Sequence, residues 1–185
     1  MDSTKNKSHG PPLWRRLLIG RNPKITLIRI AVLVLAVLLT YRFAIVPVQI
    51  KGPSMLPTYQ ENGVNFVNRL AYFSHEPQRG DVVTIRYSGT SIMLMKRVIG
   101  LPGETVAFHE GRAMINGVAL DEPYLKYTSD WERAPVTVKT GQYFVVGDNR
   151  SMPQELHVFG ATERQRIIGK IILCKNLFAS SASSR

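Results

Sequence analysis

The sequence predicts a mainly β fold, in which an antiparallel β-sheet domain follows one N-terminal transmembrane helix. A long apolar run occupies positions 25–46. After it, short segments rich in Val, Ile, Tyr and Phe alternate with Gly and Pro, a composition typical of strands and turns. Asn116-Gly117 separates two such segments and is a dipeptide preferred in tight hairpin turns.

The apolar run at 25–46 is long enough to cross a membrane, which takes about 20 apolar residues. Arg29 and Arg42 must then lie near its two ends, where long side chains can reach the headgroups. The alternatives are a cleaved signal peptide and a buried core helix. A cleavage site would need small residues after the run, whereas the sequence has Thr40-Tyr41-Arg42. We therefore expect a retained anchor.

Positive charge gathers before the anchor, in the segment 1–24, which we expect to be irregular. The positive-inside rule places such a flank in the cytoplasm. A single-pass protein would result, with an extracytoplasmic β domain at 47–178 and a flexible tail at 179–185. Much of the net charge of +11 belongs to this flank, so we expect a lipid bilayer as partner and no nucleic acid.

Strand-like segments fill the predicted β domain. They lie at 45–51, 64–67, 81–87, 92–99, 104–108, 112–115, 118–120, 142–146 and 166–172. Cys174 is the only cysteine, which excludes an internal disulfide and a cysteine-rich zinc site. We expect Cys174 to be a buried core residue, and we expect no metal and no organic cofactor.

The segment Gly52-Pro53-Ser54-Met55-Leu56-Pro57-Thr58 holds the first candidate for catalysis. Proline biases the preceding residue toward an extended backbone, so Gly52 and Leu56 are expected to be extended on either side of Ser54. A serine held in this way can act as a nucleophile if a base lies within reach. None of the four histidines has an evident catalytic setting, and the better base is Lys96.

Lys96 lies in a mostly apolar predicted strand, and the nearest downstream acid is Glu104. Free lysine has a pKa of about 10.4 and is protonated at neutral pH, but burial lowers that pKa by up to about 3–5 units. The neutral amine could then accept the proton of Ser54, a known variant of triad chemistry. The alternatives are an ordinary turn serine and a lysine that reaches solvent from an edge strand.

Four ordered motifs resemble the conserved boxes of type I signal peptidases, over roughly residues 25–173. Gly52–Thr58 is similar to their nucleophile box and Lys96–Glu104 to their base box. Arg79-Gly80-Asp81-Val82-Val83 is similar to the box between these two, and Gly147-Asp148-Asn149-Arg150-Ser151 to the last. The resemblance implies a membrane-anchored endopeptidase of the bacterial cytoplasmic membrane that removes signal peptides from exported preproteins.

The resemblance also implies the roles of individual residues. Ser54 would be the nucleophile, Lys96 the general base, and the backbone N–H of Ser54 part of the oxyanion hole. Some members add a hydroxyl where this chain has Gly52. The preprotein would bind as an extended peptide, with small side chains in pockets lined by Val48, Ile50, Met55 and Met95. Supporting roles fall to Gly52, Asp148, Arg150 and Ser151.

The chain departs from the family after its last motif. The family serine that often hydrogen-bonds the lysine is replaced by Pro153, and an arginine by His157. Ser151 is our candidate for the missing hydroxyl that orients the lysine. A charged His157 in place of the arginine would make the site sensitive to pH. We interpret the chain as a divergent or specialised member.

Two other functions remain open from the sequence. One is a different Ser-Lys processing peptidase, such as a pilin-processing enzyme of a conjugation system or a mitochondrial inner-membrane peptidase. The other is a catalytically weak regulatory or binding protein that keeps the fold, an alternative raised by the altered segment 151–158. A self-cleaving repressor is less favoured, because residues 1–45 contain no pair of DNA-binding helices.

Overall fold

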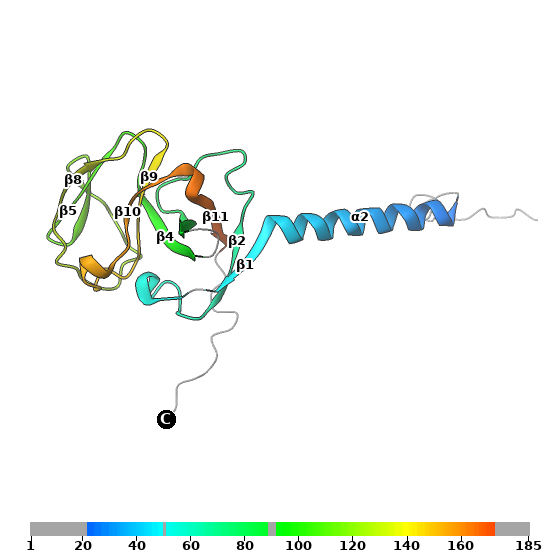
Figure 1. Cartoon of the computed structure of the whole chain (residues 1–185), viewed down its shortest axis with the longest axis horizontal. Helices are drawn as coiled ribbons and strands as arrows, with labels where there is room; N and C mark the ends of the chain where they lie inside the picture. Colours follow the sequence, from blue (N-terminus) through cyan, green and yellow to red (C-terminus); the bar gives the residue numbers. More distant parts are fainter. Residues whose placement is uncertain (1–21, 50, 89–91, 173–185) are drawn as a thin grey trace, which may run out of the picture. The chain divides into compact units, whose positions relative to one another are not determined.

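The computed structural model describes residues 22–49, 51–88 and 92–172, and Figure 1 shows the chain. The chain divides into two units at the boundary between Phe43 and Ala44. The first holds almost all of one helix and the second holds every described strand. The predicted segments 1–24 and 179–185, and Cys174, lie wholly or almost wholly outside the described residues.

Helix α2 spans Pro23–Ala44. The helix is long enough and apolar enough to cross a membrane, with a mean hydropathy of 2.1. Nearly all of its side chains are exposed. The helix ends two residues before the end of the predicted anchor, because Ile45 and Val46 already belong to a strand and pair with Asn68 and Val67. Arg42 lies in its last turn, as expected for a charge near the end of the span.

The larger sheet has seven strands, all paired antiparallel, in the order β1-β2-β11-β3-β4-β9-β10. Their bounds are β1 Ile45–Gln49, β2 Val64–Asn68, β3 Val82–Ser88, β4 Ile92–Gly100, β9 Gln142–Val146, β10 Gly160–Glu163 and β11 Ile167–Ile172. Strand β1, which follows the helix directly, forms one edge of this sheet. The predicted mainly β, antiparallel fold is confirmed.

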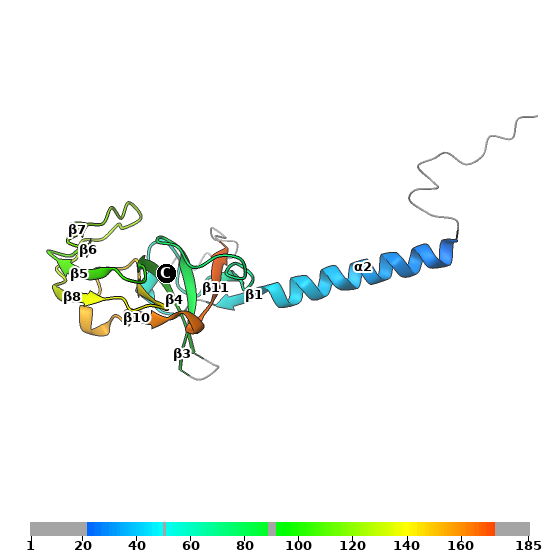
Figure 2. The same cartoon turned by 90° about the horizontal axis from the view of Figure 1, so that it is seen from above.

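The smaller sheet has the order β7-β6-β5-β8. Its strands are β5 Thr105–His109, β6 Arg112–Ile115, β7 Val118–Ala119 and β8 Arg133–Thr137. Figures 1 and 2 show it on the side of the β domain away from β1. The predicted hairpin at Asn116-Gly117 is confirmed, with φ of 51° and 81° at these two residues and Ile115 opposite Val118.

Two strands, β8 and β10, were not predicted. Strand β8 contains Pro135, and both strands are short and carry exposed polar or charged residues. Such segments lack the apolar alternation that signals a strand. Their pairing partners, β5 and β9, are well-formed strands with buried apolar positions, so the neighbouring strands rather than local preference decide their conformation.

Three clusters of buried apolar side chains form the core. One contains Ile99, Phe144 and Val146 of the larger sheet together with Val106, Phe108 and Ala113 of the smaller sheet, and therefore joins the two sheets. A second cluster contains side chains of β3, β4, β9 and β11, together with Tyr72. The third contains Met55, Tyr59, Val67, Val82 and Ile171. Met55 ties the segment of Ser54 to the core of the larger sheet.

Candidate functional site

Ser54 lies in the short 3₁₀ turn η1, Pro53–Met55, between β1 and β2, and it is partly exposed. Leu56 is extended, as predicted, with φ −63° and ψ 149°. The prediction of an ordinary extended Gly52 is wrong, because its φ of 94° with ψ 155° belongs to a region that glycine alone adopts readily. A glycine at position 52 is therefore required by the backbone that leads into the turn.

Residues of the loop after β9 hold the backbone of this turn. The backbone N–H of Asn149 donates to the Ser54 carbonyl at 3.0 Å, and its side-chain amide donates to the Pro53 carbonyl at 3.1 Å. The hydroxyl of Ser151 donates to the side-chain oxygen of Asn149 at 2.7 Å. These bonds fix the position of Ser54 from residues nearly a hundred positions later in the sequence.

Ser151 does not take the role predicted for it. Its side chain is exposed, and its hydroxyl orients Asn149 instead of Lys96. It supports the site through the backbone of Ser54, one step removed from the base.

A buried ion pair anchors the same loop. Asp148 is fully buried and accepts two bonds from Arg97, at 2.8 Å from Nε and 2.5 Å from Nη2. The hydroxyl of Thr58 donates to Asp148 at 2.6 Å, and the ring of Tyr124 lies 3.8 Å from the Arg97 guanidinium carbon. A bidentate pair of this kind is directional, so it sets the angle at which the loop meets the turn of Ser54.

Arg150 also stabilises the loop after β9, through hydrogen bonds and an ion pair. The residue is 1% exposed, and its guanidinium donates to Glu122 at 2.5 Å and to the Gly147 carbonyl at 3.0 Å. Phe108 and Trp131 pack around the charged group. The sequence pattern pointed to Asp148 and Arg150, but not to their partners Arg97 and Glu122, which lie far away in the sequence.

The strand register brings Lys96 to the turn of Ser54. Strand β4 pairs with β9 through Val98 opposite Val145 and Arg97 opposite Val146. One step further along the same register, Lys96 faces Gly147. A Cβ on Gly147 would lie only 2.2 Å from the Ser54 carbonyl oxygen. Opposite residues in antiparallel strands direct their side chains to the same face, so Lys96 extends beside the turn.

Lys96 is 2% exposed. Burial lowers the pKa of its amine to about 8, although the negative charge of Asp148 acts in the opposite direction. The lowered pKa agrees with the sequence prediction. The influence of Asp148 was not predicted, since no acid is close to Lys96 in the sequence. Apolar Ile85, Leu94 and Val145 share a pocket with the lysine. No hydrogen bond joins Lys96 to Ser54 in the described part of the chain.

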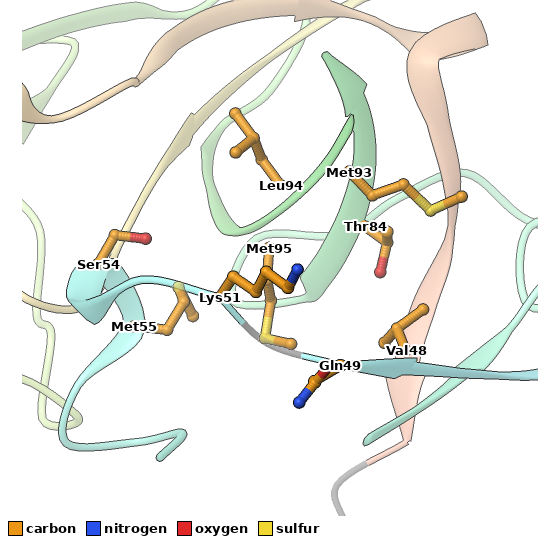
Figure 3. Close-up of a pocket in the computed structure, with 9 residues that line it drawn as sticks. All are labelled: Val48, Gln49, Lys51, Ser54, Met55, Thr84, Met93, Leu94 and Met95. Carbon is orange, nitrogen blue, oxygen red and sulfur yellow. The ribbon is translucent and has the colours of Figure 1, made fainter. Parts of the chain in front are cut away.

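Ser54 borders a small pocket of about 50 Å³. Three predicted pocket residues, Val48, Met55 and Met95, line it with Ser54, whereas the predicted Ile50 lies outside the described residues. Figure 3 shows Ser54 on one side of the pocket and Val48 on the other. The sequence analysis missed five further lining residues, Gln49, Lys51, Thr84, Met93 and Leu94.

His157 does not carry the charge that the sequence analysis considered. It is 4% exposed, and burial, reinforced by the charges of Lys96 and Arg150, lowers its pKa to about 3. An interaction with the Ser54 backbone raises the pKa, but this effect is smaller than the others. The imidazole is therefore neutral near pH 7, and a switch based on its titration in that range is wrong.

We searched residues 22–49, 51–88 and 92–172 for side chains that could bind a metal ion. Within these ranges no group of three or more His, Cys, Asp or Glu side chains could hold a metal ion. The arrangement presents a serine hydroxyl, a buried amine of lowered pKa and a small pocket with both apolar and polar walls, which together suit nucleophilic chemistry on an extended substrate.

Comparison with known proteins gives a consistent result. Residues 24–175 match the family described as signal peptidase, peptidase S26. Signal peptidase I of Leptolyngbya laminosa is 36% identical over 132 residues, which cover 67% of this chain and 65% of that protein. A probable signal peptidase I-2 of Synechocystis is 30% identical over 90% of this chain and 76% of its own length. Signal peptidase I T of Bacillus subtilis is 36% identical over 76% and 78%, respectively.

The burial of Lys96 makes a prediction about stability. We expect Lys96→Met to raise the free energy of unfolding at pH 7, by up to about 3 kcal/mol. The folded-state pKa is about 8 and the ordinary value is 10.5. Between pH 8 and pH 10.5 the unfolded chain binds more protons than the folded chain, so the stability of the unsubstituted protein rises with pH. The difference in stability between it and Lys96→Met therefore becomes smaller as the pH rises.

Urea unfolding of both proteins in detergent, from pH 7 to pH 10, measures this difference. Lys139→Met, a substitution of an exposed lysine, is the matched control and should show no such trend. A Lys96→Met protein that is less stable at pH 7, or a difference independent of pH, would contradict the prediction.

Proposed function

The chain belongs to the signal peptidase family, peptidase S26, and we propose that it is a membrane-anchored serine endopeptidase. Its substrates are exported preproteins, from which it removes the signal peptide after small residues. Helix α2 holds the β domain at the outer face of the cytoplasmic membrane, and the basic segment before it stays inside. The family match carries the reaction class, and the apolar helix supports the anchor.

Ser54 and Lys96 carry out the chemistry in this proposal. The neutral amine of Lys96 takes the proton of the Ser54 hydroxyl while the hydroxyl oxygen attacks the scissile carbonyl. The backbone N–H of Ser54 stabilises the negative charge on the carbonyl oxygen. The amine nitrogen of the mature protein then leaves with that proton, and water hydrolyses the acyl-enzyme. The pairing is supported by the register of β4 and β9, which, continued one residue past Arg97 and Val146, sets buried Lys96 opposite Gly147, a residue that lies against Ser54.

The lowered pKa of Lys96 lets part of the amine be neutral, and so able to accept a proton, near neutral pH. With a pKa of about 8, roughly one tenth of the amine is neutral at pH 7 and about half at pH 8. At its ordinary pKa almost none would be neutral. The negative charge of Asp148 limits this lowering of the pKa. Its carboxylate accepts hydrogen bonds from Arg97 and Thr58 and none from Lys96 within the described residues.

The substrate lies extended between β1 and β4. Strand β1 is an edge strand of the larger sheet, and an edge strand can pair with a peptide backbone. Val48 of β1 and Met95 of β4 line the same pocket as Ser54. The volume of about 50 Å³ accommodates small side chains, which supports cleavage after residues such as alanine.

Replacement of either member of the proposed dyad should abolish cleavage. We expect Ser54→Ala and Lys96→Met each to lower kcat by at least about 1,000-fold, since such residues act as a unit. Detergent-solubilised protein is incubated with a preprotein, and the product is identified by its new N-terminus. The kcat/KM of the unsubstituted protein should rise with pH, with an acid limb near pH 8, because only the neutral amine is the base.

Ser74→Ala and Lys139→Met, both at exposed positions, are the matched controls and should keep full activity. Cleavage that survives in Lys96→Met would refute the dyad. An unsubstituted protein that cleaves no preprotein would instead favour a regulatory or binding role for the fold.

The pocket should set the size of the residues that precede the cleaved bond. Met95→Ala is expected to raise kcat/KM for precursors with valine in place of alanine at these positions by roughly tenfold, because the pocket gains volume. Competition between the two precursors in one reaction measures the ratio. Met114→Ala, in the smaller sheet and away from the pocket, is the control, and an unchanged ratio in Met95→Ala would contradict the assignment.

Membrane topology is tested separately. In inside-out vesicles we expect an N-terminal tag to be digested by added protease and a C-terminal tag to be protected, because the basic flank stays on the cytoplasmic side. Vesicles opened with detergent serve as the control in which both tags are lost. The opposite pattern of protection would refute the proposed orientation.

A further inference from the structure

His157 is a buried polar side chain whose ring nitrogens make no well-formed hydrogen bond with the described residues. It follows the 3₁₀ turn η2, Gln154–Leu156, and is 4% exposed. By hydrogen-bond geometry neither ring nitrogen has a partner within the described residues, although the Ser54 backbone lies close enough to favour the protonated ring. Leaving a buried polar group unpaired costs about 1–3 kcal/mol, and buried polar atoms without partners are uncommon in folded proteins. A partner that becomes available during the reaction would explain this arrangement.

The position of the ring identifies that partner. One side of the imidazole packs edge-on against Trp131 and Phe159, with ring centres 4.9 and 5.8 Å away. Another side faces Gly147, since a Cβ there would lie 2.6 Å from His157 Nε2 and 2.2 Å from the Ser54 carbonyl oxygen. The same register that places Lys96 opposite Gly147 therefore brings the lysine, the serine turn and the imidazole together.

Four charged groups of the described residues lie around this space. Lys96 reaches it from β4, Asp148 and Arg150 border it from the loop after β9, and Arg166 of the turn before β11 lines the same pocket as Lys96. Lys96 and Arg150 act on the imidazole, whereas Asp148 acts on Lys96. Trp131 and Phe159 contribute only aromatic surface. The imidazole is neutral, so one of its nitrogens is an acceptor without a proton, and it is too weak a base to replace Lys96 near pH 7.

We propose that His157 is a positioning residue for the base: its free ring nitrogen accepts a hydrogen bond from the amine of Lys96 and turns the amine lone pair toward the Ser54 hydroxyl. This inference rests on the Ser54–Lys96 dyad of the proposed function. The proton moves from Ser54 to Lys96, and no bond of His157 forms or breaks. The acceptor continues to bind the ammonium after that transfer, so it holds the base through the whole step.

Three groups of the loop after β9 are less suited to this role. Pro153 has no side-chain acceptor, and Ser151 is bonded to Asn149. Both oxygens of Asp148 already accept hydrogen bonds, from Arg97 and Thr58. Two buried groups near Lys96 have an acceptor without a partner among the described residues: the hydroxyl of Thr162, which lines the same pocket as Lys96, and the ring of His157. We choose His157 because the charge of Lys96 acts on its ring.

The test compares His157→Phe, which keeps an aromatic ring without an acceptor, with His157→Gln, which keeps an acceptor. We expect His157→Phe to lower kcat about 100-fold, as for a misplaced catalytic group, with KM changed less than threefold. Its acid limb in kcat/KM should move to lower pH by up to about one unit, since an acceptor favours the ammonium. His157→Gln should restore at least tenfold of the lost kcat and return the limb toward its original position.

His109→Phe, an exposed histidine of β5, is the control and should keep both kcat and the acid limb. Circular dichroism and unfolding curves report the folded fraction, and His157→Leu replaces His157→Phe, with the same expectation, if the latter does not fold. A structural role would lower the folded fraction and leave the acid limb in place.

Two results would overturn the inference, and they are distinguishable. If Lys96→Met is inactive but the acceptor-free variants keep the original kcat per folded molecule and the original acid limb, His157 does not position the base and the dyad stands. If Lys96→Met still cleaves, the dyad and the role of His157 fail together.

Discussion

The site depends on the close contact between the backbone at Gly147 and the turn that carries Ser54. A side chain at position 147 would overlap the Ser54 carbonyl and the ring of His157. Only the absence of a Cβ lets two loops and a strand meet at this point. The hydrogen bond from Asn149 to Ser54 and the buried pair of Asp148 with Arg97 keep the contact in one geometry. Position 147 therefore tolerates glycine alone without displacement of the serine.

Two buried ion pairs lie around this contact. Arg97 pairs with Asp148 and Arg150 with Glu122, yet Asp148 still raises the pKa of Lys96 and Arg150 still lowers that of His157. Lys96 belongs to neither pair, and its burial disfavours its charged form more than Asp148 favours it. Buried ion pairs contribute little net stability because desolvation offsets their attraction. Here their value is directional, since they orient the loop next to the base.

Much of the fold could be predicted from the sequence, and the failures are informative. Strands with apolar alternation and the Asn116-Gly117 hairpin were identified, because period and turn chemistry are local properties. Strands β8 and β10 were missed, because their pairing depends on a neighbouring strand. In the site, Ser54 and Lys96 stood out by their local setting, whereas Arg97, Glu122 and Thr84 gave no local signal of their role. Ser151 was assigned to Lys96 on spacing alone, and the structure gives it to Asn149.

The sequence by itself determined the apolar span at 25–46, the mainly β class, the ordered motifs of the family and an apolar setting for Lys96. These follow from composition, periodicity and spacing, which the chain carries before it folds. Only the tertiary structure decided which groups surround the amine. Strand register and loop packing bring Gly147, Asp148 and His157 to a lysine that lies between about fifty and sixty positions earlier in the chain. Desolvation and charge act through space, so the pKa values of Lys96 and His157 are properties of the packed domain.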